Sequence, residues 1–310
     1  MSSFASSLVS GVSQGLLWAI MALGVYITFR LLDIADMTVD GSFTTGGAVT
    51  AICMMAGYHP LFAILVATLA GMAAGMITGI LTTRMKIPAL LSGILTQIGL
   101  YTINLRIMGK ANIPLTGINS QIENLFNWQL PFNASRTAVA LIIGLIFTAV
   151  IIALMYLFFG TEIGAAIRAT GNNPAMVRAL GANTKNTTLF GLMLGNALVA
   201  ISGGLVAQQQ GYSDIGMGTG AIVIGLASII IGEVLFPKTN FWFRLMGVAF
   251  GSIIYRIVIT LILRYSPLKS YDLKLFTAVV VALALWLPYL LQQIREHKAR
   301  RSNIPSRGGV

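Results

Sequence analysis

The sequence contains few charged side chains. Asp, Glu, Lys and Arg make up only 9% of its 310 residues, and its mean hydropathy is +0.83. A soluble globular domain carries about 25% charged residues, and one of this length would need a polar surface that this composition cannot supply. The chain is therefore expected to be an integral membrane protein.

Cysteine and histidine are nearly absent. Cys53 is the single cysteine, so an intrachain disulfide is excluded and the redox compartment stays open. The sequence also lacks His-Glu-x-x-His, Cys-x-x-Cys, a serine-nucleophile motif and the Gly-x-x-x-x-Gly-Lys-Ser/Thr phosphate loop. These absences argue against a membrane-embedded enzyme. They predict no catalytic residue, no metal site and no hydrolysis of ATP by this chain.

Long apolar runs take the place of charge. A bilayer core needs about 20 apolar residues per helix, and the pattern predicts an all-α, polytopic membrane protein with about nine to ten transmembrane helices. The candidate spans are residues 7–30, 42–57, 60–83, 88–106, 136–159, 186–209, 217–236, 243–264 and 274–293. Residues 1–293 form one expected transmembrane domain, followed by a basic tail at 294–310.

Basic residues set the expected orientation. When the polar loop at 160–185 is placed in the cytoplasm, most Lys and Arg residues fall on the cytoplasmic side, among them Arg84, Arg178 and Arg301. This asymmetry follows the positive-inside rule. It places the N-terminus outside and the basic tail inside. The net charge of +11 is accounted for in this way, without a nucleic-acid partner.

The loop at 160–185 contains the signals of a very short helix. Asn173 suits the N-cap, Pro174 the first helical position, and Gly181 the left-handed position after the last turn. Such a helix is too short to cross a bilayer. Met176, Val177 and Leu180 are expected on one face, which either docks into a partner's groove or packs on the chain's own helix ends.

Carboxylates and small polar residues interrupt two of the apolar runs. Carboxylates are costly in a membrane and are kept where water, a partner charge or a solute meets them, and a short helix that begins inside the membrane can line a transport path. The candidate path residues are Asp36, Asp40, Ser42, Thr44, Asp214, Gly216 and Gly218.

Other interpretations of these polar residues stay open. Asp33 and Asp36 could instead be solvated at the cytoplasmic interface near Arg30, and Asp40 and Asp214 could have a structural role. The two interrupted segments could be halves of an inverted repeat. Glu233 and Arg256 lie deeper in their spans, where a structural salt bridge between them, or with Asp214, is one interpretation.

Three long strings resemble one known family. They are GAAIRATGNNPAMVRALGANTKNTTLFGLMLGNALVAISGGLVAQQQGY (164–212), RLLDIADMTVDGSFTTGGAVTA (30–51) and TTRMKIPALLSGILTQIGLYTINLRIMGKANIPL (82–115). They resemble bacterial ABC-importer permeases that serve branched-chain amino acids, ribose and similar solutes. The third string is similar to the branch that works with tryptophan- and tyrosine-type lipoprotein binding proteins.

The resemblance implies a non-catalytic permease subunit in a bacterial cytoplasmic membrane. It implies a pair of ATP-binding subunits that hold ATP and Mg²⁺, a second permease copy, and an external substrate-binding lipoprotein. No cofactor is then expected on this chain. The residues that match the family's coupling helix, which docks on the ATPase, are Asn172, Asn173, Pro174, Met176, Arg178, Ala179, Leu180 and Gly181. The expected cargo is a small solute, with an aromatic amino acid favoured. A secondary transporter that uses membrane carboxylates for ion coupling is the alternative.

Overall fold

Helices account for nearly all of the secondary structure. The computed structural model describes residues 3–115, 125–127, 136–236, 240–265 and isolated positions between 275 and 286. Its helices are α1 (Ser3–Val25), η1 (Tyr26–Leu31), α2 (Thr38–Met55), α3 (Pro60–Thr83), α4 (Ala89–Met108), η2 (Leu125–Asn127), α5 (Arg136–Phe159), α6 (Glu162–Asn172), α7 (Pro174–Ala179), α8 (Thr184–Gln210), α9 (Ala221–Leu235) and α10 (Phe241–Tyr265).

The predicted spans coincide with these helices, with bounds that differ by a few residues. In the described ranges, five helices are long and apolar enough to cross a membrane: Ser7–Leu31, Pro60–Thr83, Thr137–Phe159, Thr184–Gln210 and Phe241–Ile262. The helix α9 is apolar but shorter. The all-α membrane fold is thus confirmed. The predicted span at 274–293 and the tail at 294–310 fall almost wholly outside the described residues.

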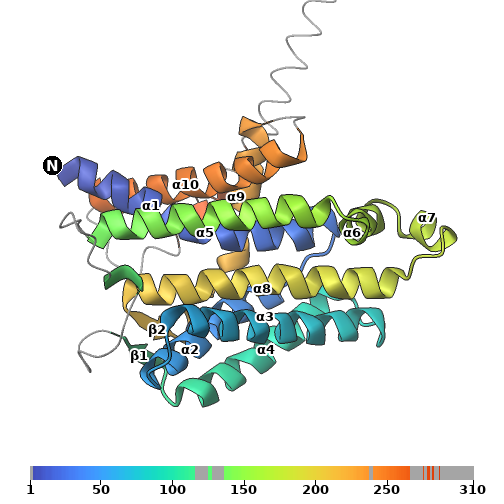
Figure 1. The fold of residues 1–310 in the computed structure, drawn as a ribbon, viewed down its shortest axis with the longest axis horizontal. Helices are drawn as coiled ribbons and strands as arrows, with labels where there is room; N and C mark the ends of the chain where they lie inside the picture. The colour runs from blue at the N-terminus through green and yellow to red at the C-terminus, as the bar shows by residue number, and fades with distance from the viewer. Residues whose placement is uncertain are drawn as a thin grey trace, which may run out of the picture.

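The long helices lie side by side, and the two ends of the bundle differ (Figure 1). At one end the chain forms α6 and α7. At the other end the loop after α4 meets the loop after α8 in a two-stranded antiparallel ribbon of β1 (Asn112–Pro114) and β2 (Tyr212–Asp214). Strand pairs at this position were not foreseen, because neither tripeptide has a strand pattern of its own.

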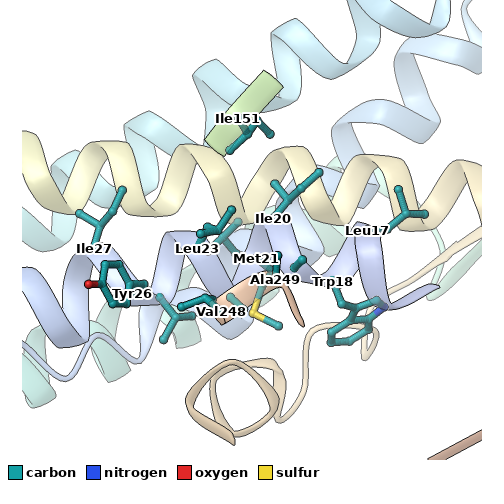
Figure 2. Packing of buried hydrophobic residues seen from close by; sticks show 14 of the residues in the cluster. Leu17, Trp18, Ile20, Met21, Leu23, Tyr26, Ile27, Ile151, Val248 and Ala249 are labelled. Carbon is teal, nitrogen blue, oxygen red and sulfur yellow. The ribbon is translucent and has the colours of Figure 1, made fainter. Parts of the chain in front are cut away.

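The first helix forms the centre of one half of the bundle. It packs against α5, α8, α9 and α10, and a run of its side chains is fully buried, including Leu17, Ile20 and Leu23. Figure 2 shows these residues together with Ile151 of α5 and Val248 of α10. A helix that is apolar on all sides is expected inside a bundle.

The helix α8 is the centre of the other half, and glycines allow its neighbours to approach its backbone. A Cβ atom at Gly24 of α1 would lie 2.5 Å from the carbonyl oxygen of Gly195. A Cβ at Gly46 of α2 would collide with the carbonyl oxygen of Ala200. Small residues at helix interfaces give this close packing in membranes, where dispersion contacts replace the hydrophobic effect.

The contact between α3 and α8 uses three glycines at four-residue spacing. Gly71, Gly75 and Gly79 lie on the face of α3 that packs on α8. A Cβ at Gly71 would lie 2.5 Å from the carbonyl oxygen of Asn196, and one at Gly79 would lie 3.2 Å from the Cα of Leu189. The two backbones are therefore in direct contact over several turns.

Alanine substitutions on α3 and α4 test this packing. Gly75→Ala places a methyl group against the Leu192 carbonyl oxygen. The atoms that would clash belong to the backbone of α8, so they cannot move aside as a flexible side chain could. We expect a loss of about 1–3 kcal/mol in stability from overpacking. The readout is the thermal unfolding midpoint of the purified protein in detergent.

Gly99→Ala on α4 is the matched control. A Cβ at this exposed helical position meets nothing within 4 Å. Alanine should therefore be neutral or stabilising, by up to about 1 kcal/mol. Equal loss in both variants would contradict the assignment of Gly75 to a backbone contact.

Candidate functional site

The loop at 160–185 folds into two helices. The helix α6 begins at Glu162, where the Thr161 hydroxyl oxygen accepts a hydrogen bond from the Gly164 amide at 3.3 Å. It ends at Asn172, next to η1, where Gly171 packs directly on the backbone of Leu31. The sequence predicted the short second helix but not α6, because the basic and polar residues of this stretch were taken as loop.

The second helix, α7, has the predicted caps. The Asn173 side-chain oxygen accepts a hydrogen bond from the Met176 amide at 3.0 Å, and Pro174 is the first helical residue. At the other end Gly181 has φ +87°. The amide of Ala182 donates to Val177 and that of Gly181 donates to Arg178, which is the Schellman pattern. A six-residue helix is thus held in shape by both of its ends.

The apolar side chains of α7 do not share one face as predicted. Val177 is buried against the chain itself, while Met176 is 48% exposed and Leu180 is 77% exposed. One residue therefore anchors α7 to its own protein, and the other two face away from it. Arg178 and Ala179 are also exposed. Met176 and Leu180 are therefore the large apolar side chains of this segment that remain for contact with another surface.

Five of the seven candidate path residues form two groups, and the first group surrounds Asn196 in the middle of α8. The Asn196 side-chain nitrogen donates to Asp36 at 2.7 Å, and its oxygen accepts from the Ser42 hydroxyl at 2.6 Å. Asp36 also accepts from the Thr38 amide at 2.9 Å. All of these groups are buried. The helix α2 therefore begins well inside the bundle, at the level of the midpoint of α8.

Asp33 and Asp36 have different environments. Asp33 is exposed and adopts a left-handed conformation, with φ +56°. Asp36 is only 1% exposed. The alternative that both carboxylates are solvated at the interface is correct for Asp33 and wrong for Asp36.

The second group lies where the N-terminal ends of α2 and α9 meet. The Asp40 carboxylate accepts hydrogen bonds from the amides of Gly220 and Ile222, at 2.8 and 3.0 Å. The Thr44 hydroxyl accepts from the Gly218 amide at 3.1 Å. A carboxylate at a helix N-terminus satisfies the free amides and interacts favourably with the helix dipole. Asp40 thus holds the N-terminal end of α9 against the first turn of α2.

Asp214 and Gly216 lie apart from both groups, in the ribbon and the turn after it. Asp214 faces Asn112 across the ribbon and accepts a hydrogen bond from its side chain at 3.2 Å. The Gly216 amide donates to the other Asp214 oxygen at 2.8 Å. These contacts stabilise the turn that leads into α9.

A cavity of about 390 Å³ adjoins the second group. We call it the Asp40 cavity. Its lining residues come from α2, α4 and the turn before α9: Asp40, Gly41, Thr44, Gln97, Ile98, Tyr101, Thr102, Asn104, Ile215 and Thr219. Small-molecule pockets have volumes of about 300–1,000 Å³, so this cavity suits one small solute. The Asp40 charge is already compensated by α9, which leaves uncharged hydrogen-bonding groups along most of its wall.

Sequence reasoning missed the part of the cavity that α4 supplies. Gln97, Tyr101 and Asn104 were not among the candidate path residues. Their spacing of four and three residues is the period of one helix face, and this signal could have identified them. Thr219 carries no such signal, because its position depends on the turn before α9.

Glu233 and Arg256 do not pair as the sequence suggested. Glu233 forms a salt bridge with Arg30 of η1 at 2.6 Å, and both side chains are partly exposed. The guanidinium carbon of Arg256 lies 3.7 Å from the centroid of the Trp18 ring, a cation–π contact within the bundle. Both contacts join helices, as expected for structural residues.

Comparisons with known proteins agree on one kind of protein. The family described as branched-chain amino acid transport system / permease component matches residues 7–285. The tyrosine transport system permease protein of Clostridioides difficile (strain R20291) is 43% identical over 89% of each chain. The inner membrane ABC transporter permease protein YjfF of Escherichia coli (strain K12) is 26% identical over 87% of this chain and 79% of that one.

A solved structure is similar in fold. The structure is PsaBC from Streptococcus pneumoniae in complex with Fab, which matches with a TM-score of 0.50 at 14% identity and covers 91% of each chain. At this identity the likeness concerns the arrangement of the helices only.

The network around Asn196 yields a stability prediction. Asn196→Ala removes a donor to the buried Asp36 carboxylate and an acceptor for the Ser42 hydroxyl, so we expect a loss of about 2–4 kcal/mol. Ser42→Ala removes one neutral hydrogen bond and should cost about 1 kcal/mol. Thermal unfolding of both single variants and the double variant measures the coupling. Strict additivity of the two losses would contradict a shared network.

Proposed function

This chain belongs to the family of permease components of branched-chain amino acid transport systems, and we propose that it carries an aromatic amino acid, tyrosine first, through the membrane. The permease of Clostridioides difficile named for tyrosine transport supports this cargo by its 43% identity over 89% of both chains. The third resemblance string, at residues 82–115, covers α4, which supplies much of the Asp40 cavity wall.

As an ABC-transporter permease component, the chain is a non-catalytic membrane subunit of an ATP-driven system. Family membership displaces the alternative of an ion-coupled secondary transporter. ATP and Mg²⁺ are then held by separate ATP-binding subunits, and this chain needs no cofactor of its own. Its task is to form a path and to respond to the ATPase.

The observation that carries the coupling role is the exposure of Met176 and Leu180 on a helix with two fixed caps. An isolated six-residue helix would be unstable in water, yet caps at Asn173 and Gly181 and the buried Val177 hold this one in place. The contact residues for the ATPase are Asn172, Asn173, Pro174, Met176, Arg178, Ala179, Leu180 and Gly181. Closure of the ATPase dimer would move α7, and α6 would transmit this movement to η1.

The path includes the Asp40 cavity. Its uncharged hydroxyl and amide groups offer several weak hydrogen bonds, and a transported solute has to be released as well as bound. Asp40, Thr44 and Gly218 hold the N-terminal ends of α2 and α9 together beside it. Asp36 and Ser42 support α2 from within the bundle, while Asp214 and Gly216 shape the turn before α9.

The complete importer would contain a second copy of this permease and an external substrate-binding lipoprotein. The ribbon end of the bundle lies opposite α7 (Figure 1) and would face the binding protein. The basic residues place α6 and α7 in the cytoplasm. The localisation is a bacterial cytoplasmic membrane, with the C-terminal tail at 294–310 on the cytoplasmic side.

Substitutions on α7 test the coupling role. Leu180→Asp places a charge in the expected apolar contact, and burial of a leucine side chain contributes about 1.5–3 kcal/mol. ATP-driven tyrosine uptake into proteoliposomes that contain the permease, its ATPase and its binding protein should fall by about tenfold or more. Arg178→Glu should have the same direction of effect.

Met85→Asp is the matched control, because Met85 is also an exposed apolar residue, 62% exposed, in the short connection between α3 and α4. Uptake by this variant should stay near the unsubstituted level. If Met85→Asp reduces uptake as strongly as Leu180→Asp, the proposal that the ATPase docks specifically on α7 is refuted.

Substitutions in the Asp40 cavity test the path. Gln97→Leu and Thr219→Val each remove hydrogen-bonding groups from its wall, and one lost hydrogen bond is worth about 0.5–1.5 kcal/mol. The combined variant should take up tyrosine about three- to tenfold more slowly at subsaturating concentration. Thr68→Val on α3, where the hydroxyl donates only to its own helix, is the control. Unchanged uptake by the cavity variant would exclude this route.

A further inference from the structure

A second large cavity lies at the end of the bundle that carries α6 and α7, between η1, α6 and α10. Its volume is about 700 Å³. We call it the arginine pocket, because Arg30, Arg168 and Arg244 line it together with Tyr26, Asn172 and Phe241. The proposed transport path does not use it.

Arginines outnumber carboxylates in the described wall of the arginine pocket. Arg30 is paired with Glu233 at 2.6 Å, and the described lining includes no Asp or Glu. Arg244 hydrogen-bonds to the phenol of Tyr26, which is a neutral partner. Arg168 stacks on the ring of Phe241, with 5.3 Å from its guanidinium carbon to the ring centroid. Arg168 and Arg244 thus both contribute positive charge to the described wall of the cavity.

Arg168 is held in position but lacks a full set of acceptors. Its Nε is buried and has no hydrogen-bond partner among the described residues. An arginine donates from a planar fork that suits two oxygens of a phosphate or a carboxylate. Stacking on Phe241 fixes the plane of this fork. An anionic group with more than one oxygen would supply the acceptor that Nε lacks among the described residues.

The location of the arginine pocket favours a lipid. Trp242 follows the lining residue Phe241 in the chain and forms an edge-to-face pair with Tyr156, with 5.2 Å between the ring centroids. Such aromatic residues mark the level of lipid headgroups. Phe243, the neighbour of Arg244, is 49% exposed and offers an apolar surface for an acyl chain. Basic pockets between transmembrane helices on the cytoplasmic side suit anionic headgroups.

We infer that the arginine pocket binds the phosphate of an anionic phospholipid headgroup, through Arg168 and Arg244. The headgroup would connect α6, which leads into α7, with the N-terminal end of α10. Since Gly171 of α6 already rests on Leu31 of η1, a bound headgroup would complete the contact of this loop with the membrane domain.

The test measures lipid binding and does not depend on transport. Purified permease in detergent is titrated with phosphatidylglycerol or phosphatidylcholine, and native mass spectrometry counts the bound lipids. We expect at least one phosphatidylglycerol to bind about tenfold more tightly than phosphatidylcholine. Arg168→Gln together with Arg244→Gln should abolish this preference.

Two further variants distinguish the effect of position from the effect of charge, and thermal unfolding controls for loss of folding. Arg84→Gln removes one charge from an exposed site at the same end of the bundle and should retain the preference. Arg168→Lys keeps the charge but loses the fork, and it should bind phosphatidylglycerol with intermediate affinity. Thermal unfolding of each variant shows whether it is folded before lipid is added.

Soluble phosphate distinguishes the two sources of the anion. Inorganic phosphate at millimolar concentration should not displace phosphatidylglycerol if the acyl chains contribute to binding. Displacement by phosphate, equal affinity for both lipids, or equal loss of preference in Arg84→Gln would each overturn the proposal.

Discussion

The fold depends on the close approach of neighbouring backbones to α8. Side chains as large as Leu would hold helices about 8–10 Å apart, but glycines on α1, α2 and α3 remove this spacing at their contacts with α8. In lipid the hydrophobic effect does not drive helix association, so stability has to come from packing contacts and buried hydrogen bonds. Asn196 can bridge Asp36 and Ser42 only because α2 is already this close to α8.

The two polar groups near the start of α2, around Asn196 and around Asp40, have different structural roles. The Asn196 network satisfies a carboxylate that is almost entirely buried, where an unpaired acid would be very costly. The Asp40 contact satisfies the amides of Gly220 and Ile222 at the N-terminal end of α9, which begins inside the protein. Both depend on an early start of α2, at Thr38. The same start leaves the cavity between α2, α4 and the turn before α9, so the support of the helix and the space for a solute have one origin.

The sequence was sufficient for features that depend on local chemistry. The caps of α7 were predictable because Asn173, Pro174 and Gly181 each have a conformational preference of their own, and the long apolar runs located the spans. Features that depend on distant residues were not predictable. The pairing of Glu233 with Arg30, the stacking of Arg256 on Trp18 and the burial of Val177 follow from helix packing, which a single sequence does not encode in any short pattern. The part of the cavity wall on α4 was predictable only in part. The helical spacing of its polar residues is visible in the sequence, but the residues that they face across the cavity are not.

The ribbon of β1 and β2 restricts how the bundle can deform. It links the chain just after α4 to the chain just after α8, and the Leu115 and Ile215 amides extend the hydrogen bonds beyond the three paired residues on each side. The corresponding ends of α4 and α8 are thereby tied at a fixed separation. Separation of these two helix ends would break several hydrogen bonds at once. Any change in the spacing of α4 and α8 is therefore restricted at the ribbon and is less restricted toward the opposite end of the bundle, where α7 is located.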